Sequence, residues 1–143
     1  MVIWFDMDGT FVDLYGVENW LNMLITENEK PYEIAKPLFK MNTFARELNK
    51  LQKMGYEIGI VSWLSKSGGA SYGEKVTAAK LNWLKTHLKS VSFDYIDILP
   101  YGTPKHKGRT GILFDDEKPN RENWVGVAYD VKNILEILKT LEI

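Results

Sequence analysis

Two acidic pairs follow short apolar runs in this sequence, and their placement suits a site for a divalent cation. Asp6 and Asp8 come directly after Val2–Phe5, and Asp115 and Asp116 come directly after a second apolar run. A short apolar run that ends in acids is typical of a buried strand. Carboxylates gathered at neighbouring strand ends would repel one another and take up protons unless a cation neutralised them.

The residue types indicate which cation and which reaction. The acidic pairs offer only oxygen ligands, with no histidine beside them, which favours a hard cation and Mg²⁺ above all where a phosphate shares the site. An aspartate held through one oxygen can attack phosphorus with the other and form an aspartyl-phosphate. A second aspartate can protonate the leaving group and then activate water.

Further polar residues occupy the same positions relative to other strands. Ser62 ends the second apolar strand, and Lys105 and Lys107 lie in the loop after the third. A lysine and a hydroxyl at this place can hold phosphoryl oxygens and stabilise the charge that develops during transfer. The backbone N–H groups of Gly9 and Thr10 can add donors to a phosphate.

The elements that position these residues alternate between apolar runs and helical stretches. Helical periodicity predicts helices around residues 44–51, 81–88 and 131–141, and residues 65–73 form a Gly-rich loop. The predicted strands are Val2–Phe5, Tyr56–Leu64, Phe93–Leu99, Gly111–Phe114 and Trp124–Tyr129. This order predicts an α/β fold with a five-stranded, mostly parallel sheet and helices on both faces. Ligands of such sheets bind beyond the carboxyl ends of the strands, where the residues above gather.

Residues 14–41 separate the first strand from the first long helix. Val17, Leu21 and Leu24 recur on one helical face, and Pro31 and Pro37 then break or start short helices. We expect a single domain over residues 1–143 in which 14–41 form a small helical cap. A cap this short favours an open site.

Composition excludes several classes of protein. The chain has 143 residues, 18 Lys and Arg against 19 Asp and Glu, and no cysteine, so disulfide scaffolds, cysteine zinc sites and thiol nucleophiles are excluded. A net charge of −1 argues against a membrane-surface protein and disfavours, without excluding, a nucleic-acid partner. No apolar run approaches the ~20 residues of a membrane span. Acids within the first six residues do not suit a signal peptide, so we expect a cytoplasmic protein.

Taken in order, the motifs resemble those of the haloacid dehalogenase-like (HAD) superfamily of phosphohydrolases, nearly from end to end. The first motif of that family, DxDx(T/V), is matched by residues 6–10, DMDGT. The other three are matched by Ser62, by Lys105 or Lys107, and by Asp115 with Asp116. The resemblance implies a three-layer Rossmann-like fold and a Mg²⁺-dependent phosphatase that acts through an aspartyl-phosphate.

The resemblance also implies roles for single residues. It makes Asp6 the nucleophile and a Mg²⁺ ligand, and Asp8 the general acid and base that binds the ion through its backbone carbonyl. Ser62 and the lysine would orient the phosphoryl group. Asp116 would be the fourth-motif ligand, with Asp115 supporting it. An acid at the position of Asp8 is what the phosphatases of the superfamily have, and it disfavours dehalogenase and phosphonatase reactions.

Within the superfamily, residues 73–88 and 93–105 resemble the pyrimidine-type 5′(3′)-deoxyribonucleotidases, and this alignment selects Lys105 for the third motif. A nucleotide is therefore one expected small phosphorylated substrate. Trp63 is a candidate substrate contact, although strand alternation turns it away from Ser62 and favours packing. Two alternatives stay open: a phosphatase for nucleic-acid ends or for proteins, and a catalytically idle binding module. The sequence leaves the oligomeric state undetermined.

Overall fold

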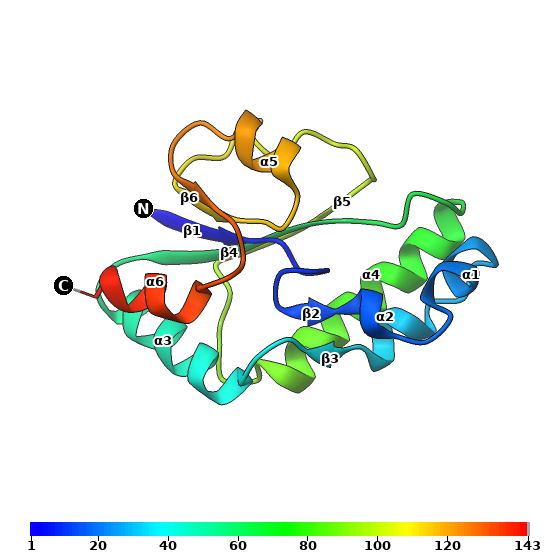
Figure 1. Cartoon of the computed structure of the whole chain (residues 1–143), viewed down its shortest axis with the longest axis horizontal. Helices are drawn as coiled ribbons and strands as arrows, with labels where there is room; N and C mark the ends of the chain where they lie inside the picture. The colour runs from blue at the N-terminus through cyan, green and yellow to red at the C-terminus, as the bar shows by residue number, and fades with distance from the viewer. Residues whose placement is uncertain (143) are drawn as a thin grey trace.

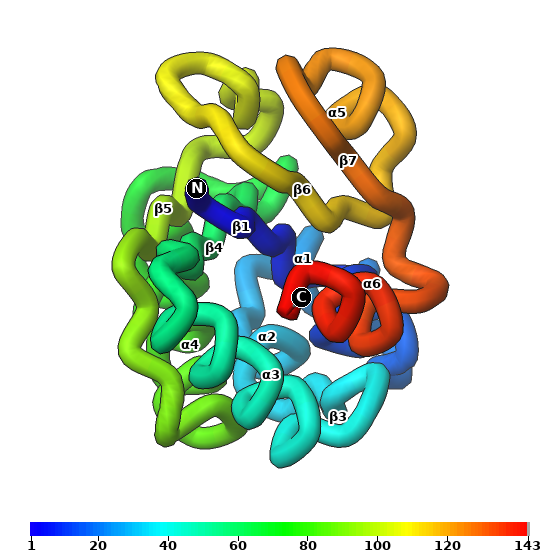
Figure 2. Tube along the Cα trace, turned by 90° about the vertical axis from the view of Figure 1, so that its left-hand side faces the viewer, coloured from blue at the N-terminus to red at the C-terminus, as the bar shows by residue number. Residues whose placement is uncertain are grey.

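The computed structural model describes residues 1–142, which fold around a five-stranded sheet in which all neighbouring strands are parallel. Figure 2 shows the strands side by side in the order β5–β4–β1–β6–β7. Their bounds are β1 Val2–Phe5, β4 Glu57–Trp63, β5 Tyr95–Leu99, β6 Ile112–Phe114 and β7 Ala128–Tyr129. The fold class expected from the sequence is confirmed, although β7 is shorter than the predicted strand.

One face of the sheet carries the main hydrophobic core. Alternation along β1 turns Ile3 and Phe5 to this face, where α3 (Met41–Lys53), α6 (Ile134–Thr140) and the second half of α4 (Ala70–His87) cover them. In Figure 1, α3 and α6 lie below the sheet. Helix α3 forms because its apolar residues Phe44, Leu48 and Leu51 recur on one face, which is fully buried here.

The opposite face has a much thinner cover. It consists of the short helix α5 (Lys118–Asn123) and the helix-free segment 100–111 between β5 and β6. Trp4 packs on this side, directly over Gly59 of the next strand. A Cβ at position 59 would lie 2.6 Å from the Trp4 ring, so the close approach requires glycine.

Segment 100–111 is fastened to this thin face by aromatic and charged side chains. The indole N–H of Trp4 donates to the carbonyl of Thr110 at 3.0 Å, and that of Trp63 donates to the carbonyl of Thr103 at 2.8 Å. Arg109 pairs with Asp97 of β5 at 2.9 Å and also donates to the carbonyl of Lys105. These bonds fix the course of a loop that has no secondary structure of its own.

Residues 12–37 form a small layer against the first half of α4. It contains an antiparallel pair, β2 (Val12–Asp13) and β3 (Lys36–Pro37), the 3₁₀ turn Leu14–Gly16, and helices α1 (Trp20–Ile25) and α2 (Lys30–Ile34). Its buried side chains meet those of α4 in a separate hydrophobic cluster: Leu14, Leu24, Tyr32, Tyr72, Val76 and Ala79. The short helices expected within 14–41 are therefore present.

Helix α4 differs from the sequence-based prediction. It begins at Ala70, whereas residues 65–73 were expected to be loop and the helix to be centred on 81–88. Its first half packs on the layer formed by residues 12–37 and its second half on the sheet, and one buried stripe with Tyr72, Val76, Ala79 and Trp83 serves both. Among residues 1–142, no helix is both long and apolar enough to cross a membrane.

Candidate active site

The strand ends bring the predicted acids together. Phe5 of β1 is in register with Phe114 of β6, so the residues that follow both strands emerge at the same edge of the sheet. The backbone N–H of Asp6 donates to the carbonyl of Phe114 at 2.9 Å and extends this pairing by one residue. Asp6, Asp115 and Asp116 each offer a carboxylate oxygen within 4.8 Å of the others.

This acidic cluster has the character of a cation site. Burial, together with the negative charge of Asp6, raises the pKa of Asp116 to about 8. Burial and Asp6 also raise the pKa of Asp115. The Oδ1 atom of Asp116 is buried and has no hydrogen-bond partner in the part of the chain that the structure describes. An orphaned carboxylate oxygen among like charges fits a hard divalent cation such as Mg²⁺.

Lys105 lies on the other side of Asp6 and neutralises part of this charge. Its side chain is 3% exposed, and its ammonium lies 2.9 Å from Asp6 Oδ1 and 2.8 Å from Asp115 Oδ2. Burial alone would lower the pKa of Lys105, but the two carboxylates outweigh burial and raise it. Asp115 accepts further hydrogen bonds from Asn120 and from the backbone N–H of Glu117. Asp115 is thus occupied with holding Lys105 and the loop, whereas Asp116 keeps a free oxygen.

The turn after β1 orients the side chains of Asp6 and Asp8. Gly9 adopts a positive φ of 81°, and a Cβ there would collide with Asp116 Oδ2, so the turn requires glycine. The side chain of Thr10 donates to Asp6 Oδ2 at 3.1 Å and orients the carboxylate. The backbone N–H groups of Gly9 and Thr10 donate to Val12 and Met7 inside the turn. The sequence suggested these two N–H groups as phosphate donors, and here both are already paired inside the turn.

Asp8 is held by a residue that sequence reasoning missed. Lys80 of α4 lies 2.8 Å from Asp8 Oδ2 and is 1% exposed. The same ammonium donates to Ser62 Oγ and to the carbonyl of Trp63, each at 2.7 Å. Burial raises the pKa of Asp8 in spite of the neighbouring lysine. Ser62 is fully buried, and the structure brings it to Lys80 rather than to an open surface.

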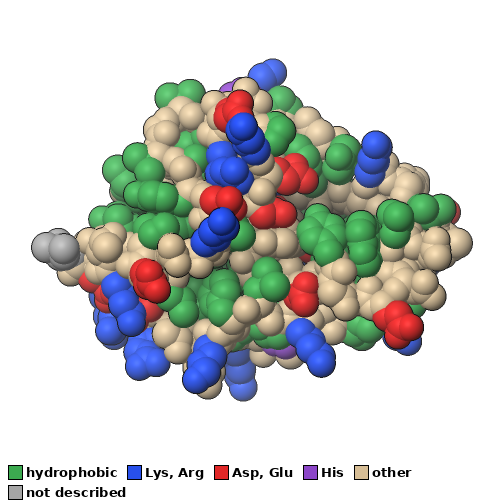
Figure 3. All heavy atoms as spheres, in the orientation of Figure 1, with side chains coloured by type: hydrophobic (Ala, Val, Ile, Leu, Met, Phe, Trp, Pro, Cys, Tyr) green, Lys and Arg blue, Asp and Glu red, His purple; other side chains and the backbone are tan. Residues whose placement is uncertain are grey.

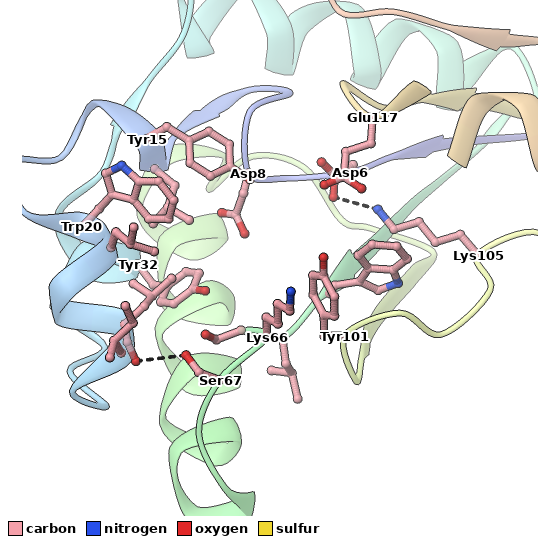
Figure 4. A pocket seen from close by; sticks show the side chains of 17 residues that line it. Asp6, Asp8, Tyr15, Trp20, Tyr32, Lys66, Ser67, Tyr101, Lys105 and Glu117 are labelled. Carbon is pink, nitrogen blue, oxygen red and sulfur yellow. Dashed lines mark hydrogen bonds and ion pairs between the residues drawn. The ribbon is translucent and has the colours of Figure 1, made fainter. Parts of the chain in front are cut away.

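A cavity of about 550 Å³ opens beyond these groups. Asp6, Asp8 and Lys105 line its inner end. Figure 4 shows the aromatic rings of Tyr15, Trp20 and Tyr32 on one side of the cavity and Tyr101 on the other. The other lining residues are apolar (Leu14, Leu21, Leu24, Ile25, Trp63 and Leu64) or polar (Ser65, Lys66, Ser67 and Glu117). On the surface in Figure 3, hydrophobic side chains lie close to acidic ones on this face.

Trp63 and Lys107 were also expected to contact the substrate, and the structure places them in different parts of the molecule. Trp63 lines the cavity, and its ring centroid lies 5.0 Å from the Lys105 ammonium. Lys107 is exposed and borders another hollow, beside Trp4 and Tyr95 on the thin face of the sheet. Of the two lysines, the structure brings Lys105 to the acids and leaves Lys107 away from them.

A faint signal for Lys80 was present in the sequence. Tyr72, Val76, Ala79 and Trp83 recur at helical spacing, which would have extended the predicted helix through this lysine. A lysine beside a buried helical face needs a buried partner, but the sequence does not show which residue that partner is. The partner, Asp8, is 72 residues away in the chain.

No protein-family model matches the sequence, and no curated protein matches it. Among solved structures, the chain is similar to D,D-heptose 1,7-bisphosphate phosphatase from Burkholderia thailandensis, with 9% identity and a TM-score of 0.57. The match covers 98% of this chain and 97% of that one. Over nearly its whole length, the chain therefore shares the α/β fold of that protein, with the parallel sheet and flanking helices that the sequence predicts.

Proposed function

We propose that this protein is a phosphomonoester hydrolase that works through an aspartyl-phosphate on Asp6. The observation that carries the proposal is the setting of this one carboxylate. Lys105 binds its Oδ1 and Thr10 its Oδ2, Asp116 lies beside it, and the cavity opens in front of it. A carboxylate that is oriented on both oxygens and open to a cavity is prepared to act as a nucleophile.

The reaction has two steps. In the first, an oxygen of Asp6 bonds to phosphorus while the bond to the leaving oxygen breaks, and Asp8 gives that oxygen its proton. In the second, water attacks the same phosphorus, Asp8 takes up a proton from the water, and the Asp6 carboxylate is released with inorganic phosphate. Asp8 suits both steps because burial raises its pKa, and it lines the cavity next to Asp6.

Negative charge on the transferring group needs nearby donors. The Lys105 ammonium uses two of its three N–H groups on Asp6 and Asp115, so one is left for a phosphoryl oxygen. The backbone N–H groups of Met7 and Asp8 take no part in the hydrogen bonds of the turn and can serve as further donors. These groups replace Gly9 and Thr10 in our assignment of phosphate contacts.

We propose Mg²⁺ as the cofactor, held by Asp6, Asp116 and the backbone carbonyl of Asp8, with Asp115 in support. The orphaned oxygen of Asp116 and the absence of nitrogen or sulfur ligands from the cluster support a hard cation. When bound, the ion supplies positive charge that allows Asp6 and the phosphate to approach each other.

We further propose a substrate with an aromatic leaving group, such as a nucleoside monophosphate. The protein that shares the fold is named for a sugar bisphosphate. The cavity here instead offers Tyr15, Trp20, Tyr32 and Tyr101 together with several aliphatic side chains. The aromatic and aliphatic walls favour a flat apolar group next to the phosphate, and Ser65, Lys66 and Ser67, which also line the cavity, can bind the polar part of such a substrate.

A phosphate-release assay over a panel of substrates tests this proposal. The panel contains nucleoside monophosphates, a heptose bisphosphate, 3′-phosphorylated oligonucleotides and a phosphotyrosine peptide, each with Mg²⁺ and with EDTA. We expect Mg²⁺-dependent turnover, fastest with the mononucleotides. Preference for the oligonucleotide or the peptide would instead select a nucleic-acid-end or protein phosphatase. No turnover with any divalent cation would favour a binding module.

A further inference from the structure

Lys80 is a buried charge that the proposed reaction does not use. It belongs to α4, whereas the other site residues follow or end strands, and only 1% of its side chain is exposed. The ring of Tyr32 closes over it, with the centroid 5.3 Å from the ammonium. Burying an ammonium is costly unless it is fully paired, so its surroundings indicate a specific task.

The hydrogen bonds of Lys80 exclude direct binding of a phosphate. An ammonium has three N–H donors, and Lys80 spends them on Asp8 Oδ2, Ser62 Oγ and the carbonyl of Trp63 at 2.7–2.8 Å. Lys105, in contrast, has two carboxylate partners and one donor left. Lys80 also does not line the cavity, whereas Lys105 does.

The same bonds tie Asp8 to the end of a strand. Ser62 and Trp63 are the last two residues of β4, whose backbone is fixed by pairing with β1 and β5. Asp8 itself follows β1 in a turn and is a short side chain beside the negative Asp6. The Lys80 ammonium bridges from the rigid end of β4 to one oxygen of this carboxylate. Asp8 Oδ1 is then the oxygen left to carry a transferable proton.

We propose that Lys80 is a positioning residue: it holds Asp8 by Oδ2, with Ser62 and the Trp63 carbonyl as anchors, so that Oδ1 delivers its proton to the leaving oxygen. This inference rests on the proposed phosphatase function. In the step concerned, the bond from Asp6 to phosphorus forms, the bond to the leaving oxygen breaks, and the proton on Asp8 Oδ1 passes to that oxygen. Lys80 neither gains nor loses a proton.

A comparison of two substrates isolates this role. 4-Nitrophenyl phosphate and benzyl phosphate both carry one aromatic ring, so they make similar contacts with the cavity walls. Nitrophenolate leaves readily without a proton, whereas benzyl alcohol leaves only with one. The kcat/KM value reports on the first chemical step, so the ratio of kcat/KM for the two substrates measures proton delivery by Asp8.

The variant is Lys80→Met, which keeps the length of the side chain and removes its charge and donors. We expect kcat/KM to fall about 100-fold for benzyl phosphate and less than about 10-fold for 4-nitrophenyl phosphate. Lys80→Gln retains two N–H donors and should recover part of the loss with benzyl phosphate. It also serves as the test variant if the methionine variant does not fold.

The matched control is Leu88→Ala, which weakens the buried end of the same helix two turns away. It should change both substrates by the same factor. If the Lys80 variants also lower both substrates equally, Lys80 is only structural and the inference is overturned. If the wild-type protein hydrolyses neither substrate with Mg²⁺, the proposed function itself fails and the inference falls with it.

Discussion

The inner end of the cavity and its walls are built in different ways. The inner end is lined by Asp6, Asp8 and Lys105, which are fixed by strand pairing and by short ionic hydrogen bonds. The walls come mainly from α1 and from residues 63–67, and the side chains of Leu21 and Ile25 in α1 remain 53% and 58% exposed. The inner end is thus preorganised for one chemistry, whereas the walls can change without disturbing it. Variants of the inner end should therefore mainly lower kcat, whereas variants of the walls should mainly change KM.

The largest effect is expected at Asp6. Asp6→Asn removes the nucleophile but also relieves repulsion in the acidic cluster, so the protein should fold normally and lose at least about 1,000-fold in kcat. Phosphate release and the thermal unfolding midpoint of the same sample measure both properties. A variant with wild-type turnover would remove Asp6 from the nucleophile role.

Lys105 and Lys107 provide the next test because they lie two residues apart in the same loop. Lys105→Met leaves Asp6 and Asp115 without their shared cation, and we expect about 100-fold lower kcat. It should also lower the free energy of unfolding, by about 3–5 kcal/mol. Lys107→Met is the matched control and should change neither quantity, since Lys107 is exposed and away from the acids. The opposite ranking in urea titrations and kinetics would contradict the assignment of Lys105.

The acidic cluster should also make stability depend on pH and on the cation. The pKa of Asp116 is about 8 in the folded protein against an ordinary value of 3.8, so the folded state holds a proton that the unfolded state loses between these values. For the ion-free protein, the free energy of unfolding should therefore fall as the pH rises from about 4 to 8. Mg²⁺ should raise the unfolding midpoint more at pH 8 than at pH 6, because it competes with this proton.

Asp116→Asn is the control for that experiment. It should flatten the pH dependence and weaken the response to Mg²⁺, both followed by thermal unfolding in EDTA and in Mg²⁺. A variant with the same slope as the wild type would assign the pH dependence to other groups.

The smallest effect is expected in the walls. Trp20→Ala removes a ring that packs against Tyr15 with centroids 4.9 Å apart. We expect KM for a nucleoside monophosphate to rise about 5-fold to 10-fold with kcat nearly unchanged. Glu18→Ala, an exposed neighbour that does not line the cavity, should have no effect. A fall in kcat with unchanged KM would place Trp20 with the inner end of the cavity.

The sequence predicted the inner end of the cavity better than the walls for a physical reason. Asp6, Asp115 and Asp116 follow continuous apolar strands, and parallel strands bring such residues to one edge whatever surrounds them. Lys80 reaches the site only because α4 packs against the layer formed by residues 12–37. The Gly-rich residues 65–73 were expected to be a loop, so the sequence did not reveal that α4 begins at Ala70. The bonds that occupy the N–H groups of Gly9 and Thr10 depend on the course of the turn after β1, which residue types alone do not reveal.

Because segment 100–111 is held by residues on the thinly covered face of the sheet, that face helps to position Lys105. Lys105 lies in a loop without secondary structure, and its carbonyl accepts a hydrogen bond from Arg109. The guanidinium of Arg109 lies 5.5 Å from the centroid of the Trp4 ring. Trp4 in turn rests on Gly59. A side chain added at position 59 would tilt that indole, loosen the arginine and let the lysine drift from Asp6. Damage to turnover can thus begin at a residue that no substrate ever reaches.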